Sequence, residues 1–421
     1  MRIAPSRDYF DAAAFRADTP GAATVVHLNA AGAGLPPRIV TETVMRHLAE
    51  EASVGPHWAA ARAKDGLHDV RAAAAELLQC RPRNVAFGGS AGTMWAMAFL
   101  AMPVKRCSRV LVARSEWAGN VLNLMKRRLA DAITIEIMPV DERSGRIDVE
   151  RVADLIDERT AAICLPLVAS GSGVRQPVEL VAKLPRPEGC LLLVDGAQAV
   201  GQLPVGMANT DADVLVVPSR KWLRGPRGEA IMALSDRALE RLGDPPVLSQ
   251  AGSSWTSIDN YATRADARRF ETYEFSVAGR LGLGAAITHA LEHGIENIRD
   301  VIRARLVRIR SGLTAIPGVT VLEEDTTKSA FLTFTSDAFI PAELNDYLAE
   351  ANIAAAVVDR DYARADLEAR GLEAVNRVAP HAYTSEEDID RFLDVISVAS
   401  RRTWRRNAGY RSSGRARTST G

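Results

Sequence analysis

The feature that most constrains this chain is an alternation of short, almost wholly apolar runs with longer stretches of helical pattern. The apolar runs are rich in Val, Leu and Ile, which is typical of strands that are covered on both faces. They lie at residues 85–89, 109–113, 161–169, 190–195, 213–217 and 230–234. Helical patterns such as 119–130 and 148–157 separate them. This alternation predicts an α/β fold with a mostly parallel sheet.

The pattern changes after about residue 240. Residues 244–275 are polar and irregular, which predicts a long ordered loop or an interface segment. Residues 276–315 form one long helical stretch that would link two domains, and residues 319–400 give the shorter strands and helices of a smaller α+β domain. We therefore expect a large domain over 41–295 and a small C-terminal domain over 296–400.

The two ends of the chain differ from the body. Residues 1–40 are rich in Pro, Gly and Ala and are expected to form an arm that packs on the body. Residues 401–421 are basic and contain few apolar side chains, so we expect a disordered tail there, with a nucleic-acid-binding arm as the less favoured alternative. The N-terminal residues lack the basic start and apolar core of a secretory signal.

Charge and cysteine content exclude several classes of protein. The 52 basic and 52 acidic residues give a formal net charge of +0, which offers no general reason to expect nucleic acid or an anionic membrane as a partner. No apolar run approaches the roughly 20 residues that span a bilayer. The four cysteines, at positions 80, 107, 164 and 190, have no metal-ligand spacing. We expect free thiols, a reducing cytoplasm and no bound metal.

Two neighbouring segments carry the strongest chemical signal. In CLLLVDGAQAVGQ (190–202) an apolar strand ends in Asp195, and in DVLVVPSRKWLRGPRG (213–228) the next strand runs into a loop that bears Lys221. The carboxyl ends of parallel strands are where open α/β sheets bind ligands. A lysine amine can condense with the aldehyde of pyridoxal phosphate (PLP), and a carboxylate can keep the pyridine nitrogen protonated. Gln198 lies close enough to Asp195 to reach the phenolic oxygen of the ring.

These segments resemble the class V aminotransferase family of fold-type I PLP enzymes, which includes cysteine desulfurases and isopenicillin N epimerase-like proteins. The family pattern of a strand, D-x-x-Q, a second strand, the lysine and G-P-x-G corresponds here to DGAQ (195–198) and SRKWLRGPRG (219–228). Within the family, the resemblance is strongest to hercynylcysteine sulfoxide lyase-like C–S lyases, and it covers about residues 25–400. It implies a mostly parallel sheet of the seven-stranded type in a large domain, with a smaller α+β C-terminal domain.

The resemblance also implies how the cofactor is bound. It places the phosphate at Ala91, Gly92, Thr93, Ser219 and Arg220. The first three lie in FGGSAGTMWAM (87–97), where a strand passes into a helix whose N-terminal amides suit an anion. Trp117, in SEWAGN (115–120), is implied to stack on the pyridine ring, although a core or rim aromatic is the alternative. Ser170 is implied to border the phenolic oxygen.

The substrate-binding residues follow from the same resemblance. Arg377, in NRVAPHAY (376–383), corresponds to the arginine that grips the substrate carboxylate. Asn29 and Ala30 are implied to border the substrate, and His57 is equally well explained as a pocket wall or as a surface residue. In relatives, the region matching 252–276 reaches the active site of the neighbouring subunit, which implies a homodimer.

The reaction is left partly open by the sequence. No cysteine follows Cys190, so the mobile nucleophilic cysteine of persulfide-forming desulfurases is missing from the C-terminal half. We therefore favour β-elimination from an S-substituted cysteine, which would give a thiol or sulfenate, pyruvate and ammonia, in an ergothioneine-like or sulfur-containing antibiotic pathway. Transamination, decarboxylating oxidative deamination and epimerisation remain alternatives. A non-catalytic binding protein would be expected to lack Lys221, Asp195 or Arg377, and all three are present.

Overall fold

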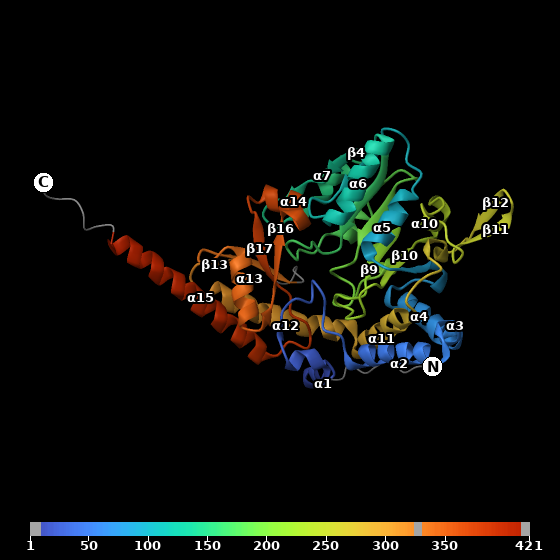
Figure 1. Cartoon of the computed structure of the whole chain (residues 1–421). Coiled ribbons are helices and arrows are strands. Elements are labelled where there is room, and N and C mark those ends of the chain that lie inside the picture. Colours follow the sequence, from blue (N-terminus) through green and yellow to red (C-terminus); the bar gives the residue numbers. More distant parts are fainter. Residues whose placement is uncertain (1–9, 324–330, 414–421) are drawn as a thin grey trace.

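A seven-stranded sheet forms the centre of the large domain in the computed structural model, which describes residues 10–323 and 331–413, with side chains up to Arg401 (Figure 1). The strand order is β2-β10-β9-β8-β7-β3-β4. Only β10 runs antiparallel to its neighbours, so the predicted mostly parallel α/β sheet is confirmed. The strands are β2 (Val85–Gly88), β10 (Ala230–Leu234), β9 (Val214–Pro218), β8 (Leu191–Asp195), β7 (Thr160–Pro166), β3 (Arg109–Val112) and β4 (Thr134–Ile137).

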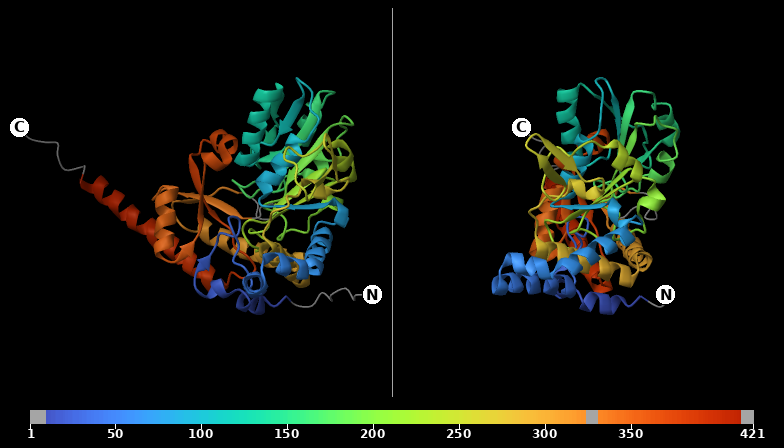
Figure 2. Two further views of the ribbon diagram at one scale, coloured as in Figure 1. Left: turned by 45° about the vertical axis from the view of Figure 1, so that its right-hand side comes forward. Right: turned by 90° about the vertical axis from the view of Figure 1, so that its right-hand side faces the viewer.

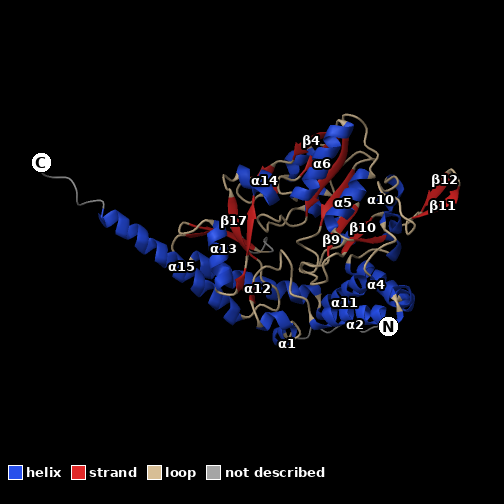
Figure 3. Ribbon diagram, viewed as in Figure 1, coloured by secondary structure: helices blue, strands red, loops and turns tan. Residues whose placement is uncertain are grey.

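The two faces of the sheet are buried in separate cores, which explains why the strand sequences are continuously apolar. Along β8, Leu192 and Val194 face one core, whereas Leu191 and Leu193 face the other. Helices surround the sheet (Figure 3). They are α2 (Arg38–Val54), α3 (Pro56–Arg62), α4 (Lys64–Leu77), α5 (Ala91–Leu100), α6 (Ala118–Asp131), α7 (Val149–Ala153), α8 (Val178–Val181), α9 (Met207–Thr210), α10 (Asp236–Arg241) and α11 (Val277–His293).

The small domain contains a four-stranded antiparallel sheet of order β13-β14-β17-β16. Its strands are β13 (Val319–Val321), β14 (Leu332–Ser336), β16 (Ala356–Asp359) and β17 (Ala374–Val378). Its helices are α12 (Ile295–Thr314), α13 (Pro341–Glu350), α14 (Arg360–Ala369) and α15 (Glu386–Ser413). Figure 2 shows this domain beside the large one, with α15 projecting away from the body.

Several local expectations need correction. Residues 276–315 are two helices, because Gly294 between them has a φ of +78° that a continuing helix cannot contain. The helix expected over 148–157 is only α7. The irregular segment 244–275 contains a hairpin of β11 (Ser253–Ser257) and β12 (Asn260–Thr263). Strand β4 was not expected.

The C-terminal expectation also differs from the structure. Where the sequence predicts disorder over 401–421, the backbone of α15 continues as helix to Ser413. Residues 414–421 lie outside the described residues. The domain boundaries at 41–295 and 296–400 remain predictions.

The N-terminal arm contacts both domains. It contains α1 (Ala12–Ala17) and β1 (Val26–His27), and β1 pairs in parallel with β15 (Ile353–Ala354) of the small domain. Three residues after β1, the amide of Ala30 donates to the carbonyl of Ala379 at 3.0 Å. The arm then reaches the large domain, because the amide of Gly34 donates to the carbonyl of Arg220 at 2.9 Å.

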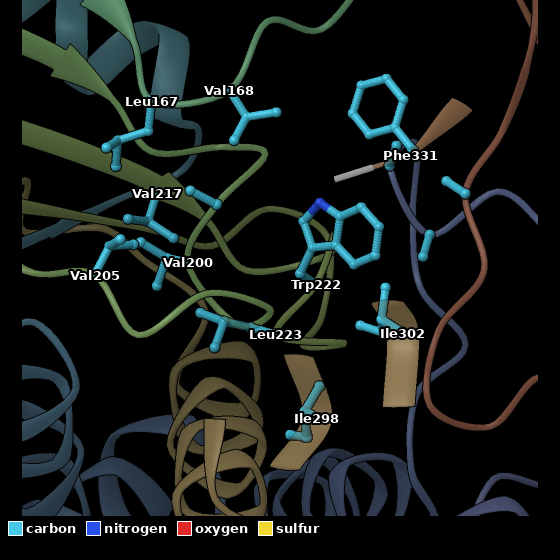
Figure 4. Packing of buried hydrophobic residues seen from close by; sticks show 14 of the residues in the cluster. Leu167, Val168, Val200, Val205, Val217, Trp222, Leu223, Ile298, Ile302 and Phe331 are labelled. Carbon is cyan, nitrogen blue, oxygen red and sulfur yellow. The ribbon is translucent and has the colours of Figure 1, made fainter. Parts of the chain in front are cut away.

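A buried apolar cluster supports the loop that follows β9. Trp222 and Leu223 of that loop lie among Ile298 and Ile302 of α12 and Phe331 of the small domain (Figure 4). The buried positions of α12 recur every three or four residues, which gives one apolar stripe along the helix. The loop that bears Lys221 is thereby packed against both domains.

Candidate active site

Lys221 and Asp195 meet at the carboxyl edge of the large sheet. Asp195 is the last residue of β8, and Lys221 lies just beyond the end of the parallel neighbour β9. Burial lowers the pKa of Lys221 to about 7, with further lowering by Arg377 and Arg220 and an opposing effect of Asp195. Lys221 can therefore supply a neutral amine near pH 7, as condensation with an aldehyde requires.

The turn between β2 and α5, within residues 87–97, lies at the same edge of the sheet as Lys221. Ala230, the first residue of β10, pairs with Gly88 on one side and with Pro218 on the other. The loop after β2 and the loop after β9 therefore flank the start of one strand. This register brings the two predicted phosphate segments to one place, although they are far apart in the sequence.

The first of these segments begins helix α5 at Ala91. Backbone N–H groups in the first turn of a helix have no acceptor within the helix, and a Cβ built at Gly92 would meet no atom within 4 Å. The N–H of Thr93 is already hydrogen-bonded, because it donates to Ser90 Oγ at 3.1 Å. The N–H groups of Ala91 and Gly92 are thus available to an anion, whereas the Thr93 N–H would have to give up its bond to Ser90 first. Phosphate binding by these three residues stays a prediction.

In the second predicted phosphate segment, Arg220 is available to an anion, whereas Ser219 is not. Arg220 bonds to no carboxylate in the described part of the chain, so its charge is free for a phosphate, and burial together with Arg227 lowers its pKa. Ser219 is fully buried, and its hydroxyl donates to the carbonyl of Pro226. In this geometry Ser219 holds the Gly-Pro turn after Lys221 rather than presenting its hydroxyl to a ligand.

The loop around Lys221 is held by close backbone approaches. A Cβ built at Gly34 would lie 2.6 Å from the Lys221 carbonyl oxygen, and one at Gly201 would lie 2.6 Å from the Trp222 carbonyl carbon. Gln198 donates through Nε2 to the carbonyl of Ala31 at 3.0 Å and accepts through Oε1 from Trp222 Nε1 at 3.0 Å. Gln198 therefore joins the arm to the lysine loop. Of its polar groups, only the second N–H of Nε2 is left for the bond to the phenolic oxygen of the cofactor that the sequence predicts.

Asp195 is buried in a network of hydrogen bonds. Its Oδ1 accepts from the amide of Ala197 at 2.8 Å, and its Oδ2 accepts from Asn120 Nδ2 at 3.3 Å. The same Asn120 Nδ2 donates to Glu116 Oε1 at 3.0 Å. Burial raises the pKa of Asp195, whereas Lys221 and these hydrogen bonds lower it. Glu116 and Asn120 had no assigned role in the sequence prediction, although both lie in its SEWAGN segment.

Trp117 stands at the start of α6, directly after Glu116. A Cβ at Gly119 would lie 2.6 Å from its indole nitrogen, so the glycine leaves room for the ring. The Trp117 ring lies 5.6 Å from the ring of Tyr362, at an interplanar angle of 36°. Tyr362 comes from α14 of the small domain and was not predicted, because this contact joins segments that only the fold brings together.

Arg377 is a buried cation that pairs with no carboxylate among the described residues. It lies on β17, and its Nη1 donates to the carbonyl of Ser170 at 3.1 Å. Its guanidinium lies 5.3 Å from the centre of the Phe331 ring, and its Nε has no hydrogen-bond partner in the described residues. Burial lowers its pKa to about 10. Since an unpaired buried charge is costly, this guanidinium is suited to an anionic ligand.

Of the residues that the sequence places near the substrate, Asn29 and Ala30 of the arm lie close to Arg377, whereas His57 of α3 does not. Asn29 pairs with Ala379, two residues beyond Arg377, and its buried Oδ1 accepts no hydrogen bond from the residues that the structure describes. Asn29 and Ala30 thus lie near Arg377, and their contact with the substrate stays a prediction. His57 is not brought to this site, because its side chain is exposed on α3, which packs against α2 and α4. A role for His57 in a pocket would need a second copy of the chain.

None of the four cysteines lies at the carboxyl edge of the sheet, and all four are within the described residues. Cys80, Cys107 and Cys190 precede strands β2, β3 and β8 and so lie toward the opposite edge. Cys164 is buried in the middle of β7, where burial raises its pKa. The site therefore has no nucleophilic thiol of its own.

The structure contains no arrangement of three or more His, Cys, Asp or Glu side chains that would hold a metal ion, within the residues it describes. The pair His289 and His293 contacts Phe15, and His289 bonds to Asp18 at 3.0 Å. Across the described ranges, no helix combines the length and apolar character needed to cross a bilayer.

The site fits pyridoxal phosphate. Its aldehyde needs a neutral lysine, and its ring nitrogen needs a buried acid. Its phosphate needs an open helix N-terminus and a cation such as Arg220, which pairs with no carboxylate in the described ranges, and its ring face needs a flat indole. The fit rests on which side chains lie at the carboxyl edge and on the pairing of the strands that brings them together there.

Comparison with known proteins gives a consistent result. The family model described as aminotransferase class V matches residues 25–392. A probable cysteine desulfurase of Mycobacterium leprae is 24% identical over 92% of this chain, which spans 65% of that relative's length. A probable hercynylcysteine sulfoxide lyase of Mycobacterium tuberculosis is 28% identical over 90% of this chain and 91% of its own.

Solved structures share the fold. One is a variant of the protein C-DES with glycine covalently linked to its PLP cofactor. It superposes with a TM-score of 0.82 and 19% identity, covering 91% of this chain and 98% of that chain.

Proposed function

The chain belongs to the class V aminotransferase family of PLP-dependent enzymes, and on that premise we propose that it is a C–S lyase acting on S-substituted cysteines. The observation that carries this proposal is Arg377, a buried guanidinium with no bound carboxylate in the described residues, beside a lysine whose pKa is about 7. An α-amino acid supplies the missing carboxylate and places its Cα near that lysine.

The residues of this chain have distinct tasks in the proposed reaction. When bound, PLP supplies the electron sink that makes the Cα–H bond of an amino acid acidic. Arg377 binds the substrate carboxylate through paired hydrogen bonds and so fixes the orientation of Cα. Lys221 Nζ takes the proton from Cα as a general base. Asp195 keeps a negative charge beside the ring nitrogen.

The proposed net reaction consumes one water. The Cβ–S bond breaks and its electron pair leaves with sulfur, which takes a proton to become a thiol. The remaining fragment is hydrolysed to pyruvate and ammonia. A mechanism that transfers the sulfur to the enzyme as a bound persulfide would instead need a cysteine at the site, and the four thiols of this chain lie elsewhere. Because no thiol lies at the site, we favour a lyase, as the M. tuberculosis relative is named, over a desulfurase, as the M. leprae relative is named.

We also propose that the enzyme is a homodimer. On the hairpin of β11 and β12, Trp255 is 76% exposed and Ile258 is 79% exposed. Such exposure is unusual for large apolar side chains. The hairpin projects from the large domain (Figure 1). A second copy would cover it, as the resemblance of residues 252–276 implies.

The test is to incubate the purified protein with PLP and S-alkyl or S-aryl cysteines. Equal amounts of pyruvate and free thiol are expected, and Lys221→Ala should abolish both. Lys126→Ala, at an exposed lysine on α6, is the matched control and should behave as wild type. Conversion of the conjugate to its keto acid without thiol release would indicate transamination instead. Loss of CO₂ or of optical activity alone would indicate deamination or epimerisation.

A further inference from the structure

Glu116 and Asn120 form a buried pair whose hydrogen bonds are incomplete. Glu116 is 3% exposed and Asn120 is fully buried. Glu116 Oε1 accepts two hydrogen bonds, from the amide of Trp117 at 2.9 Å and from Asn120 Nδ2 at 3.0 Å. Glu116 Oε2 and Asn120 Oδ1 have no partner in the described part of the chain. Two acceptors are thus left without a donor on side chains that already touch.

A proton on Glu116 would satisfy both atoms. A carboxylate and an amide carbonyl can only accept, so neither orphan atom can pair with the other while Glu116 is ionised. A carboxylic acid carrying its proton on Oε2 can donate to Asn120 Oδ1, while its Oε1 still accepts from Asn120 Nδ2. Turning the amide of Asn120 around would instead place its oxygen against Glu116 Oε1 and Asp195 Oδ2, which are both acceptors.

The charges around Glu116 favour the same state. The titratable groups that face it are Asp195, linked to it through Asn120, and the thiol of Cys164 on β7. No cation pairs with Glu116 within the described residues, whereas Asp195 has Lys221 nearby. Burial and Asp195 together raise the pKa of Glu116 to about 8. Two neighbouring buried acids that share one amide hold one negative charge more easily than two.

We propose that Glu116 is a neutral carboxylic acid that pairs with Asn120 and acts as a positioning residue for Asp195. The pair fixes the amide of Asn120, so that its second N–H holds Asp195 Oδ2 while the charge stays on Asp195, where the ring nitrogen of the cofactor needs it. This proposal rests on the cofactor site proposed above.

The first test uses the full chain freed of its cofactor, so it does not depend on that site. A glutamine can donate from Nε2 and accept at Oε1, which reproduces the neutral acid and cannot ionise. A raised pKa in the folded state stabilises the protein at low pH, and this contribution is lost as the pH rises from about 4.5 to about 8. Wild type should therefore lose this stabilisation as the pH rises, whereas Glu116→Gln should not. The difference in Tm, Glu116→Gln minus wild type, should increase by a few degrees between pH 5 and pH 8 and then level off.

The second test concerns the cofactor and uses its affinity rather than turnover. At pH 7, Glu116→Gln should bind PLP within about threefold of wild type, whereas Glu116→Ala should bind about tenfold more weakly, because Asn120 is no longer held. A Tm difference that does not change with pH, or a glutamine variant as weak as the alanine variant, would overturn the proposal. If wild type binds no PLP, the proposed function fails, while the Tm comparison still decides the state of Glu116.

Discussion

At the scale of single residues, the site holds ionisable groups in states that cost stability. Arg377 is buried without an anion in the described residues, and Lys221 is buried with cations nearby. Groups of this kind are retained where chemistry needs them, because a structure selected for stability alone would pair or replace them. The free energy of unfolding and the activity should therefore respond to substitution in opposite directions at such positions.

Replacement of Arg377 separates these two effects. Arg377→Met should lower kcat/KM for an S-substituted cysteine by about 100-fold, because the carboxylate loses two charge-assisted hydrogen bonds. The Tm of the cofactor-free protein should stay equal or increase, since an unpaired buried charge is removed. Steady-state kinetics and thermal melts check this. A fall in Tm of several degrees would show that Arg377 is a structural cation.

The pKa of Lys221 predicts a pH dependence. Because the free amine attacks the aldehyde, the rate at which PLP attaches should rise with pH and reach half its maximum near pH 7, rather than near 10 as for an exposed lysine. Asp195→Asn should move this midpoint to lower pH, since Asp195 raises the pKa of Lys221. Absorbance after mixing, from pH 5.5 to 9, gives the rate. A midpoint above 9 in wild type would contradict the prediction.

At the scale of elements, the sequence predicted what depends on local pattern. Continuous apolar runs predicted the central strands, and the end of such runs predicted Asp195 and Lys221. Strand β4 was missed because it lies at the sheet edge and its residues are only partly buried, so it lacks an apolar run. Asn120 was missed because it bonds to Asp195, 75 positions away, and only the paired strands bring them together.

The break between α11 and α12 depends on one residue. Gly294→Ala should destabilise the protein by about 1 kcal/mol, because its φ is +78° and an added Cβ would lie 3.0 Å from Asn297 Nδ2. Urea unfolding measures the change. Gly189→Ala is the matched control, since a Cβ there meets no atom within 4 Å and should leave stability unchanged. Equal stability of the two variants would contradict this account of the break.

The contact of the arm with the lysine loop can be tested in the same way. Gly34→Ala should weaken PLP binding by about tenfold or more, because its Cβ would displace the backbone of Lys221, which lies 2.6 Å away. Fluorescence titration with PLP measures the affinity. Unchanged affinity would mean that the arm can move without disturbing Lys221.

At the scale of the whole molecule, two domains contribute to one site. Lys221 and Asp195 come from the large domain, whereas Arg377 and Tyr362 come from the small one. The arm and α12 contact both, so the relative position of the domains is set by the ends of the chain as well as by its middle. The sequence predicted two domains, but the contact of Tyr362 with Trp117 depends on how the domains meet.

The proposed dimer gives a prediction at this scale. Replacing the exposed Trp255 and Ile258 together by Asp should convert a dimer into a monomer, because a charged hairpin cannot be buried in an apolar interface. Light scattering after gel filtration measures the mass. Wild type that runs as a monomer at every concentration would refute the dimer, and the double variant would then behave like wild type.

The pairing of β1 with β15 has a consequence for synthesis on the ribosome. The arm is made first, yet its pairing residues Ile353 and Ala354, and its contact Ala379, are made more than 300 positions later. The sheet that bears Lys221 can form in between, but the arm cannot pair with the small domain until translation is almost finished. A nascent chain that ends before residue 353 therefore lacks this pairing, and the arm of such a chain has no strand of the small domain to bind.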